Sequence, residues 1–127
     1  MVINFLGDSI TQGAGASCNE NNYVSVVGKL LNCTSNNYGV GGTRIARQVD
    51  KSTNFEPVYD LDFQLRAPSM GDADLVFVFG GTNDWGHGDA PIGEPTDTNP
   101  CTYYGGINNL IAMLTDKYGK NKLHFII

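Results

Sequence analysis

A serine near the N-terminus stands in a polar bend directly after an apolar run. The stretch INFLGDSITQGAG, residues 3–15, ends its apolar run at Gly7 and continues with Asp8 and Ser9. A strand-to-helix bend leaves backbone N–H groups free beside such a serine. Asp8 and Ser9 could therefore cap a short helix, with Asp8 accepting backbone hydrogen bonds that fix the bend. Ser9 could equally act as a nucleophile, with the free N–H groups binding an oxyanion.

Two more glycine-rich turns, NYGVGG at 37–42 and GGTND at 80–84, follow segments with strand character. The carboxyl ends of parallel strands share one edge of a sheet, so all three turns can converge there. A glycine N–H of the second turn and the side-chain amide of Asn83 would then join the N–H groups beside Ser9. Three donors around one oxygen are the pattern of an oxyanion hole.

The segments around these turns alternate between strand and helix patterns. Short apolar runs predict strands, and apolar residues spaced three and four apart predict helices. The pattern predicts strands at 2–6, within 36–44, at 75–79 and at 122–127, helices at 23–32, within 44–65 and at 103–119, and a long loop at 85–102. This alternation indicates one α/β domain over residues 1–127, with a parallel sheet covered by helices on both faces.

Two of the predicted helices carry an apolar stripe that we expect to pack on the sheet. In the first helix the stripe consists of Tyr23, Val26, Val27, Leu30 and Leu31. In the second helix it consists of Ile107, Leu110, Ile111 and Leu114. Gly28 weakens the first helix, and Gly119 is a suitable stop for the second.

The final segment, KLHFII at residues 122–127, has the pattern of an interior strand. A parallel strand is normally followed by a loop and a covering helix. We therefore expect the sequence to be the N-terminal part of a longer domain, truncated on its C-terminal side. Self-association through the unfinished sheet is the alternative.

Composition narrows the range of partners. Eight Lys and Arg against thirteen Asp and Glu give a net charge of −5, which argues against nucleic acid or anionic membranes as partners. No apolar run reaches the ~20 residues of a membrane span. No signal peptide is visible, so a cytoplasmic protein and a secreted one whose signal was removed both fit. Cys18, Cys33 and Cys101 lack metal-type spacing; three buried or half-buried thiols are expected, and one disulfide with a free thiol is the alternative.

Together, the three turns resemble the first three sequence blocks of the GDSL or SGNH hydrolases, and the resemblance extends from Ile3 to the last strand. In that family the oxyanion hole is formed by the N–H of the nucleophilic serine, a glycine that ends an N-x-G-x-x-G pattern, and an asparagine. The resemblance thus implies these roles for Ser9, Gly42 and Asn83. It also implies a flavodoxin-like three-layer α/β/α sandwich, the activity of a serine esterase or lipase-like acylhydrolase, and no cofactor.

Asp84 and His87 have D-x-x-H spacing, but they directly follow Asn83 of the third turn. The fourth block of that family is a D-x-x-H near its C-terminus, and none occurs after His87 in this sequence. It supplies the general base, so the resemblance implies that the chain alone is inactive or nearly so. We interpret His87 as a solvated loop residue that shapes the substrate mouth; a replacement base oriented by Asp89 is the sharper alternative. His124, within the last strand, is expected to pack or to lie partly exposed. Asp84 is interpreted as a turn-forming acid.

The loop at 85–102 bears on the substrate class. A small-molecule ester or an acylated glycan fits best, because the polar, glycine-rich loop at 85–102 favours a small or sugar-linked acyl group over a long lipid. Trp85 and the tyrosines at 103–104 could line a substrate groove or simply pack. Arg44 and Arg47 could attract an anion, but we interpret them as part of a solvated helix face. A non-catalytic, flavodoxin-like module that binds a glycan or acyl group is the alternative function.

Overall fold

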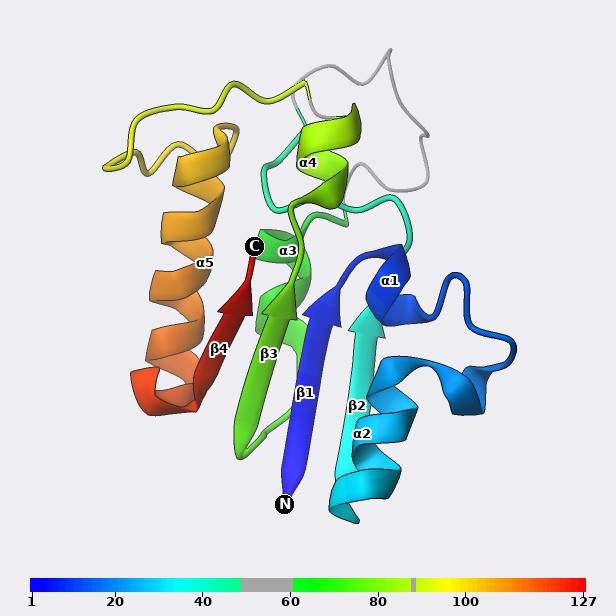
Figure 1. Ribbon diagram of the computed structural model, residues 1–127. Helices are drawn as coiled ribbons and strands as arrows, with labels where there is room; N and C mark the ends of the chain where they lie inside the picture. The colour runs from blue at the N-terminus through cyan, green and yellow to red at the C-terminus, as the bar shows by residue number, and fades with distance from the viewer. Residues whose placement is uncertain (49–60, 88) are drawn as a thin grey trace.

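The computed structural model describes residues 1–48, 61–87 and 89–127, and a four-stranded sheet forms its centre. The strands are β1 (Val2–Gly7), β2 (Thr34–Gly39), β3 (Leu75–Phe79) and β4 (Leu123–Ile126). They lie in the order β2-β1-β3-β4, and each neighbouring pair is parallel. All four carboxyl ends therefore point to one edge of the sheet (Figure 1). The predicted α/β fold with a parallel sheet is confirmed.

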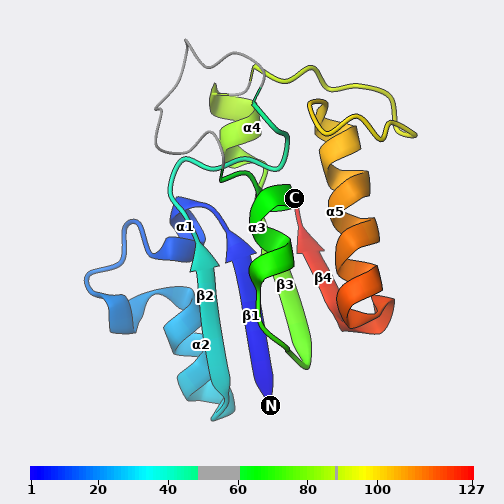
Figure 2. The same ribbon diagram turned by 180° about the vertical axis from the view of Figure 1, so that it is seen from behind.

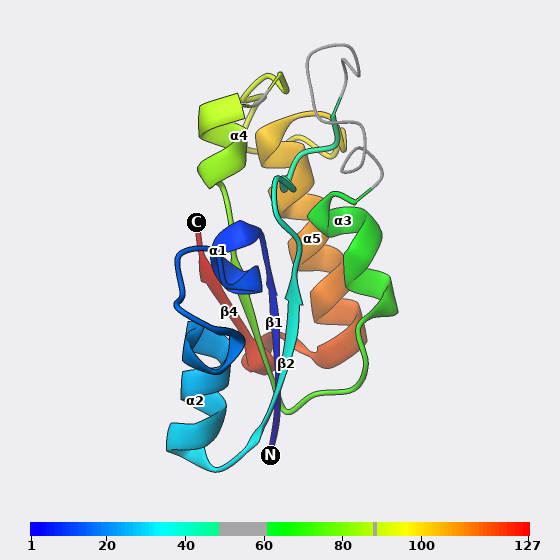
Figure 3. The ribbon, with the colours of Figure 1, turned by 90° about the vertical axis from the view of Figure 1, so that its right-hand side faces the viewer.

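Helices form a layer on each side of this sheet. Their bounds are α1 (Ser9–Gln12), α2 (Tyr23–Leu31), α3 (Phe63–Arg66), α4 (Thr82–His87) and α5 (Tyr103–Tyr118), with short 3-10 turns at Asn19–Asn21, Ala67–Ser69 and Lys120–Lys122. The turned views place α1 and α2 on one face and α3 and α5 on the other (Figures 2 and 3). The three-layer arrangement is the one predicted, and α4 stands beyond the carboxyl edge (Figure 1).

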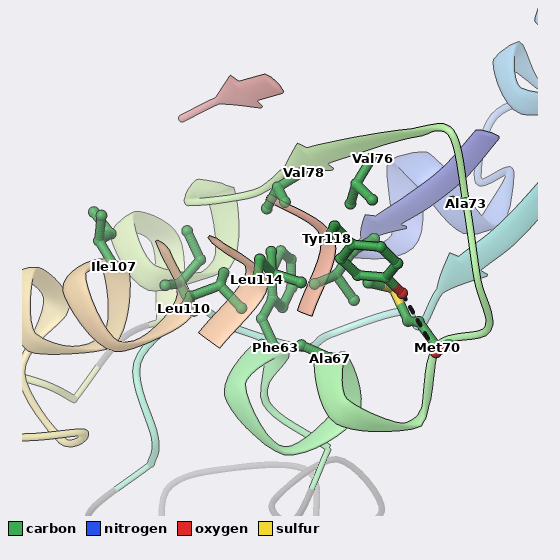
Figure 4. Packing of buried hydrophobic residues seen from close by; sticks show 12 residues of the cluster. Phe63, Ala67, Met70, Ala73, Val76, Val78, Ile107, Leu110, Leu114 and Tyr118 are labelled. Atoms are coloured by element: carbon green, nitrogen blue, oxygen red, sulfur yellow. Dashed lines mark hydrogen bonds between the residues drawn. The ribbon is translucent and has the colours of Figure 1, made fainter. Parts of the chain in front are cut away.

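The larger hydrophobic core lies between β3, α3 and α5. Figure 4 shows side chains from these elements interdigitating; they include Val76 and Val78 of β3, Phe63 of α3, and Leu110 and Leu114 of α5. Each fully buried side chain of this kind contributes about 1.5–3 kcal/mol relative to leaving it exposed. The hydroxyl of Tyr118 closes the cluster by donating to the carbonyl oxygen of Gly71 over 2.7 Å. This packing fixes α5 against the sheet.

α2 packs on β2 through a narrower face than the sequence predicts. Val24 and Gly28 are its buried residues, whereas Leu30 and Leu31 are 78% and 54% exposed. A Cβ at Gly28 would lie 2.4 Å from the Ser35 hydroxyl, so the helix approaches β2 along this glycine. The predicted apolar stripe is therefore wrong at Val26, Leu30 and Leu31, which are exposed, because the buried line of α2 runs through Val24 and Gly28 instead.

Other predicted details differ at their edges. Gly119 forms the C-cap of α5, as predicted. Of the predicted stripe, Ile107, Leu110 and Leu114 are buried, whereas Ile111 is exposed. The loop predicted at 85–102 begins later, since α4 continues through His87. Within the predicted helical segment 44–65, α3 begins only at Phe63, and residues 49–60 lie outside the described residues.

An aromatic row crosses the other face of the sheet. Phe5 stacks on Phe77 with ring centroids 5.4 Å apart, and Phe77 stacks on His124 at 4.8 Å. His124 is exposed and stacks on Phe77, in line with its expected position. Among the residues that the structure describes, α1 and α2 cover this face over β1 and β2, and no helix covers it over β4 (Figures 1 and 3).

The three cysteines are free thiols: Cys18 is exposed, unlike the prediction, and Cys33 and Cys101 are half-buried. No helix among the described residues combines the length and the apolar character that a membrane-spanning segment requires.

Candidate active site

The three glycine-rich turns meet at the carboxyl edge of the sheet. Gly7, at the end of β1, pairs in register with Gly39 on one side and with Phe79 on the other. The bend that carries Ser9 therefore lies between the turn after β2 and the turn after β3. This is the convergence that a parallel sheet predicts.

In the first bend, Asp8 rather than Ser9 caps the helix. Asp8 is 2% exposed, and its Oδ1 accepts a hydrogen bond from the backbone N–H of Ile10 over 2.9 Å. Ser9 is the first residue of α1 and is half-buried. Among the described residues, no hydrogen-bond partner faces the Ser9 hydroxyl. The capping role is thus filled by the neighbouring acid, and the serine hydroxyl remains available for another role.

The second turn is held against α1. The Asn37 side-chain amide donates to the carbonyl oxygen of Thr11 over 2.7 Å, and the N–H of Gly41 donates to Oε1 of Gln12 over 2.8 Å. A Cβ at Gly39 would lie 2.2 Å from the backbone nitrogen of Gln12, so only glycine allows this contact. The N-x-G-x-x-G pattern indicates this contact in the sequence, because its asparagine, Asn37, and its first glycine, Gly39, both contact α1.

This packing brings the second turn beside Ser9. A Cβ placed on Gly41 would lie 3.6 Å from Cβ of Ser9. Gly42 follows with a φ of +77°, in the left-handed region that favours glycine, and is exposed. The backbone of Gly41 and Gly42 therefore passes close to the predicted nucleophile.

Asn83 joins the third turn to the second. Its Nδ2 donates a hydrogen bond to the carbonyl oxygen of Thr43 over 2.9 Å, and Thr43 directly follows Gly42. A side-chain amide carries two N–H donors, so this contact uses one and leaves the other available. The three residues Ser9, Gly42 and Asn83 thus lie on three turns that touch one another.

Asp84 does more than form its turn. Its two carboxylate oxygens accept hydrogen bonds from the backbone N–H groups of Ile45 and Ala46 over 3.0 and 2.9 Å. Burial raises the pKa of the Asp84 carboxyl, and these backbone donors partly oppose that rise. Asp84 therefore fastens the chain after the second turn to α4.

Arg66 is a positioning residue that the sequence analysis missed. Its guanidinium donates to the carbonyl oxygens of Gly7 and Tyr38, with the Gly7 contact at 3.0 Å, and to the Thr43 hydroxyl at 2.9 Å. Burial lowers the pKa of Arg66 to about 10. The planar fork thus ties the ends of β1 and β2 to the second turn. Arg66 lies at the end of α3, and no local sequence pattern marks it as a positioning residue.

The two arginines after the second turn are not on a solvated helix face, so that interpretation was wrong. Arg44 is 5% exposed and forms an ion pair with Asp89 at 3.3 Å. Arg47 pairs with the buried carboxylate of Asp62 at 3.2 Å. Residues 44–48 form no helix, because their backbone N–H groups bond elsewhere: those of Ile45 and Ala46 to Asp84, and that of Arg47 to the carbonyl oxygen of Pro100.

The two histidines lie in different places. His87 is the last residue of α4, which begins with Thr82 at the carboxyl edge. His124 lies on the sheet face, in register with Phe77 and two residues before the end of β4. Among the described residues, no group of three or more His, Cys, Asp and Glu side chains could hold a metal ion.

A pocket of about 300 Å³ opens beside the third turn. Its lining residues are Gly81, Asp84, Trp85, Ala90, Ile92 and Tyr103. The sequence analysis expected Trp85 and the tyrosines at 103–104 either to line a groove or to pack. Trp85 and Tyr103 line this pocket, and Tyr104 does not.

Solved structures share this fold. A protein from Lactobacillus plantarum is 28% identical, with a TM-score of 0.78 over 97% of this chain and 53% of its own. Another crystal structure is 32% identical, with a TM-score of 0.77 over 98% and 55%. A family two carbohydrate esterase from Clostridium thermocellum, solved with cellohexaose, is 20% identical, with a TM-score of 0.62 over 98% and 41%, and this likeness concerns the fold alone. This chain spans about half the length of the first two structures.

No curated protein matches the chain. Residues 5–125, however, match the GDSL-like Lipase/Acylhydrolase family, and this range contains all three turns. With the parallel three-layer fold and the solved structures that share it, this match means that the chain belongs to the GDSL-like lipase/acylhydrolase family.

Proposed function

We propose that this chain carries the nucleophile and the oxyanion hole of a serine esterase. Ser9 would attack the carbonyl carbon of an ester, and the developing oxyanion would accept hydrogen bonds from the N–H of Ser9, the N–H of Gly42 and the side-chain amide of Asn83. A small ester or an acylated glycan is the substrate class that we assign.

The hydrogen bond between Asn83 and Thr43 is the observation that carries this proposal. It fixes the plane of the Asn83 amide against the residue after Gly42, so the remaining N–H of the amide keeps one direction. Preorganised donors of this kind stabilise a transition state because they need no reorientation when charge develops. The unengaged hydroxyl of Ser9, beside Gly41, supplies the nucleophile for the same place.

The reaction needs a base in addition to these residues. As the Ser9 oxygen bonds to the carbonyl carbon, its proton passes to the base and the C=O electron pair moves to the oxyanion. The alcohol then leaves with a proton, and water hydrolyses the acyl-serine in the same manner. The D-x-x-H spacing of this sequence, Asp84 to His87, lies beside Asn83, and both carboxylate oxygens of Asp84 accept backbone hydrogen bonds there. We therefore expect these 127 residues alone to turn over esters very slowly.

A fluorophosphonate reagent in imidazole buffer tests this proposal. Imidazole acts as the external base, and intact-mass and peptide analysis locate the phosphonyl adduct. We expect one adduct, on Ser9, and its loss in Ser9→Ala. The matched control is Ser17→Ala, because Ser17 is an exposed serine on the following loop. No adduct on Ser9, or equal labelling of Ser17, would overturn the proposal and favour a non-catalytic module that binds a glycan or acyl group.

A further inference from the structure

We propose that Gln12 is a positioning residue of the oxyanion hole. Its side chain holds the second glycine-rich turn beside Ser9 and makes Gly42, rather than Gly41, the free donor of that turn. This inference rests on the proposed function, since it assigns how one donor of the same site is held. Gln12 is the last residue of α1, three positions after Ser9, and it is exposed.

Gly41 and Gly42 are the two central residues of a β-turn. The N–H of Thr43 donates to the carbonyl oxygen of Val40 over 3.4 Å, which closes the turn. The φ of +77° at Gly42 is close to the value of about +80° that a type II turn requires at this position. A type I turn differs in the peptide between the two central residues, which is turned over so that its N–H points to the opposite side. Because glycine at both positions permits either form, contacts around the turn must fix the direction of the Gly42 N–H.

The two ends of this turn are fixed at the carboxyl edge of the sheet. The N–H of Val40 donates to the carbonyl oxygen of Gly7 over 3.1 Å. At the other end, Thr43 bonds with Asn83 and Arg66. These contacts hold the flanking residues, and the position of the two glycines between them depends on a further contact.

Gln12 supplies that contact. The N–H of Gly41 donates to its Oε1 over 2.8 Å. A Cβ on Gly41 would lie 2.9 Å from the same oxygen and 3.6 Å from Cβ of Ser9, so the Gln12 side chain meets the turn directly beside the predicted nucleophile. Because Ser9 and Gln12 belong to the same four-residue helix, this bond sets the separation of Ser9 from the glycines.

The same bond selects the donor. Each backbone N–H has one hydrogen to donate. The N–H of Gly39 donates to Oδ1 of Asn37 over 2.9 Å, and the N–H of Gly41 donates to Gln12. Within the part of the chain that the structure describes, no acceptor faces the N–H of Gly42. Of the three glycines in this turn, Gly42 therefore has the N–H that is available to an oxyanion.

Amide hydrogen exchange followed by NMR tests the contact without relying on activity. We expect the Gly41 amide to be protected and the Gly42 amide to exchange freely. Gln12→Met keeps the length of the side chain but replaces the amide oxygen with a weakly accepting thioether. It should speed exchange at Gly41 by about five- to tenfold, the share of one exposed hydrogen bond. Gln12→Glu restores an acceptor, so it should restore protection, and the Gly41 amide resonance should follow the ionisation of the new carboxyl group.

The rate at which fluorophosphonate labels Ser9 in imidazole buffer tests the consequence. Removing a donor outright costs ~10²–10³-fold, and Gln12→Met only loosens one, so we expect labelling about tenfold slower than in the wild type. Gln12→Glu should recover most of that loss in 1 M salt, which screens the added charge over about 3 Å. The matched control is Asn21→Leu, which removes an exposed amide that bonds with Ser17 and should change neither measurement.

The outcomes separate this inference from the proposed function. If Gln12→Met leaves the exchange of Gly41 or the labelling rate of Ser9 unchanged while wild-type Ser9 is labelled, the role of Gln12 is overturned and the proposed function stands. If Gln12→Met slows labelling and Gln12→Glu does not recover it in 1 M salt, the hydrogen bond is not the cause and the role is again overturned. If wild-type Ser9 is not labelled, the proposed function fails, and Gln12 then fixes a turn that serves no oxyanion.

Discussion

Nδ2 of Asn83 lies 2.9 Å from the carbonyl oxygen of Thr43, and this hydrogen bond joins the start of α4 to the turn after β2. Thr43 directly follows Gly42, whose N–H is one predicted oxyanion-hole donor, and the side-chain amide of Asn83 is another. The two residues are 40 positions apart in the sequence. The bond makes the separation of the two donors a property of the folded backbone. Changes around this contact should therefore alter both stability and reactivity at Ser9.

Arg66 should stabilise the contact between Asn83 and Thr43, because its guanidinium also hydrogen-bonds to Thr43. Arg66→Lys keeps the charge but cannot reach the carbonyl oxygens of Gly7 and Tyr38 and the Thr43 hydroxyl together. We expect the free energy of unfolding in urea to fall by about 2–3 kcal/mol, since hydrogen bonds to charged groups contribute roughly 1.5–3 kcal/mol. Labelling of Ser9 should slow as well. Lys120→Gln, at an exposed lysine, is the control, and equal stability of the two variants would contradict this role.

The contrast between Arg66 and the three turns indicates what this sequence could predict. Each turn follows its own strand, so the local patterns and the shared direction of parallel strands were enough to place Ser9 and Asn83 at one edge. The contact of Arg66 with Gly7 spans 59 residues and no pattern marks it. The exposure of Leu30 could not be predicted for a similar reason. It depends on which residues of α2 contact β2, and no local pattern marks Gly28 as one of them.

Gly39 should be essential for bringing the second turn to Ser9. In Gly39→Ala the new Cβ would lie 2.2 Å from the backbone nitrogen of Gln12, which cannot move away without unwinding α1. We expect a loss of about 2 kcal/mol or more in the free energy of unfolding. Gly86→Ala, inside α4 with no atom near the new Cβ, should instead be stabilising by up to about 1 kcal/mol. Thermal unfolding of both variants checks the pair, and a tolerated Gly39→Ala would refute the contact.

Asp84 should make stability depend on acid pH. Its pKa in the folded chain is raised above 3.8 by burial, so the folded state binds the proton more tightly than the unfolded state. This contribution to stability is complete below pH 3.8 and is lost as the pH rises through the raised pKa. The free energy of unfolding of the wild type, minus that of Asp84→Asn, should therefore decrease with rising pH in this window. If this difference increased with pH, folding would lower the pKa of Asp84, and the prediction would be contradicted.

The uncovered sheet face and edge at β4 should promote self-association. Ile126 is 55% exposed, and among the described residues β3 is the strand that pairs with β4. An exposed apolar strand edge can pair with a second copy of the chain. We expect light scattering to detect dimers or larger species, and Ile126→Lys to return the chain to a monomer while Leu30→Lys does not. A monomeric wild type at high concentration would rule this out.

The rate at which fluorophosphonate labels Ser9 in Asn83→Ala, relative to the wild type in the same imidazole buffer, tests the central claim most directly. Removing one oxyanion-hole donor typically lowers a rate by ~10²–10³-fold, and we predict a decrease of that size. Asn108→Ala, which removes another half-buried amide that donates to backbone carbonyls, should change the rate less than about twofold. If Asn83→Ala folds and labels Ser9 as fast as the wild type, Asn83 does not stabilise an oxyanion and the proposed site is wrong.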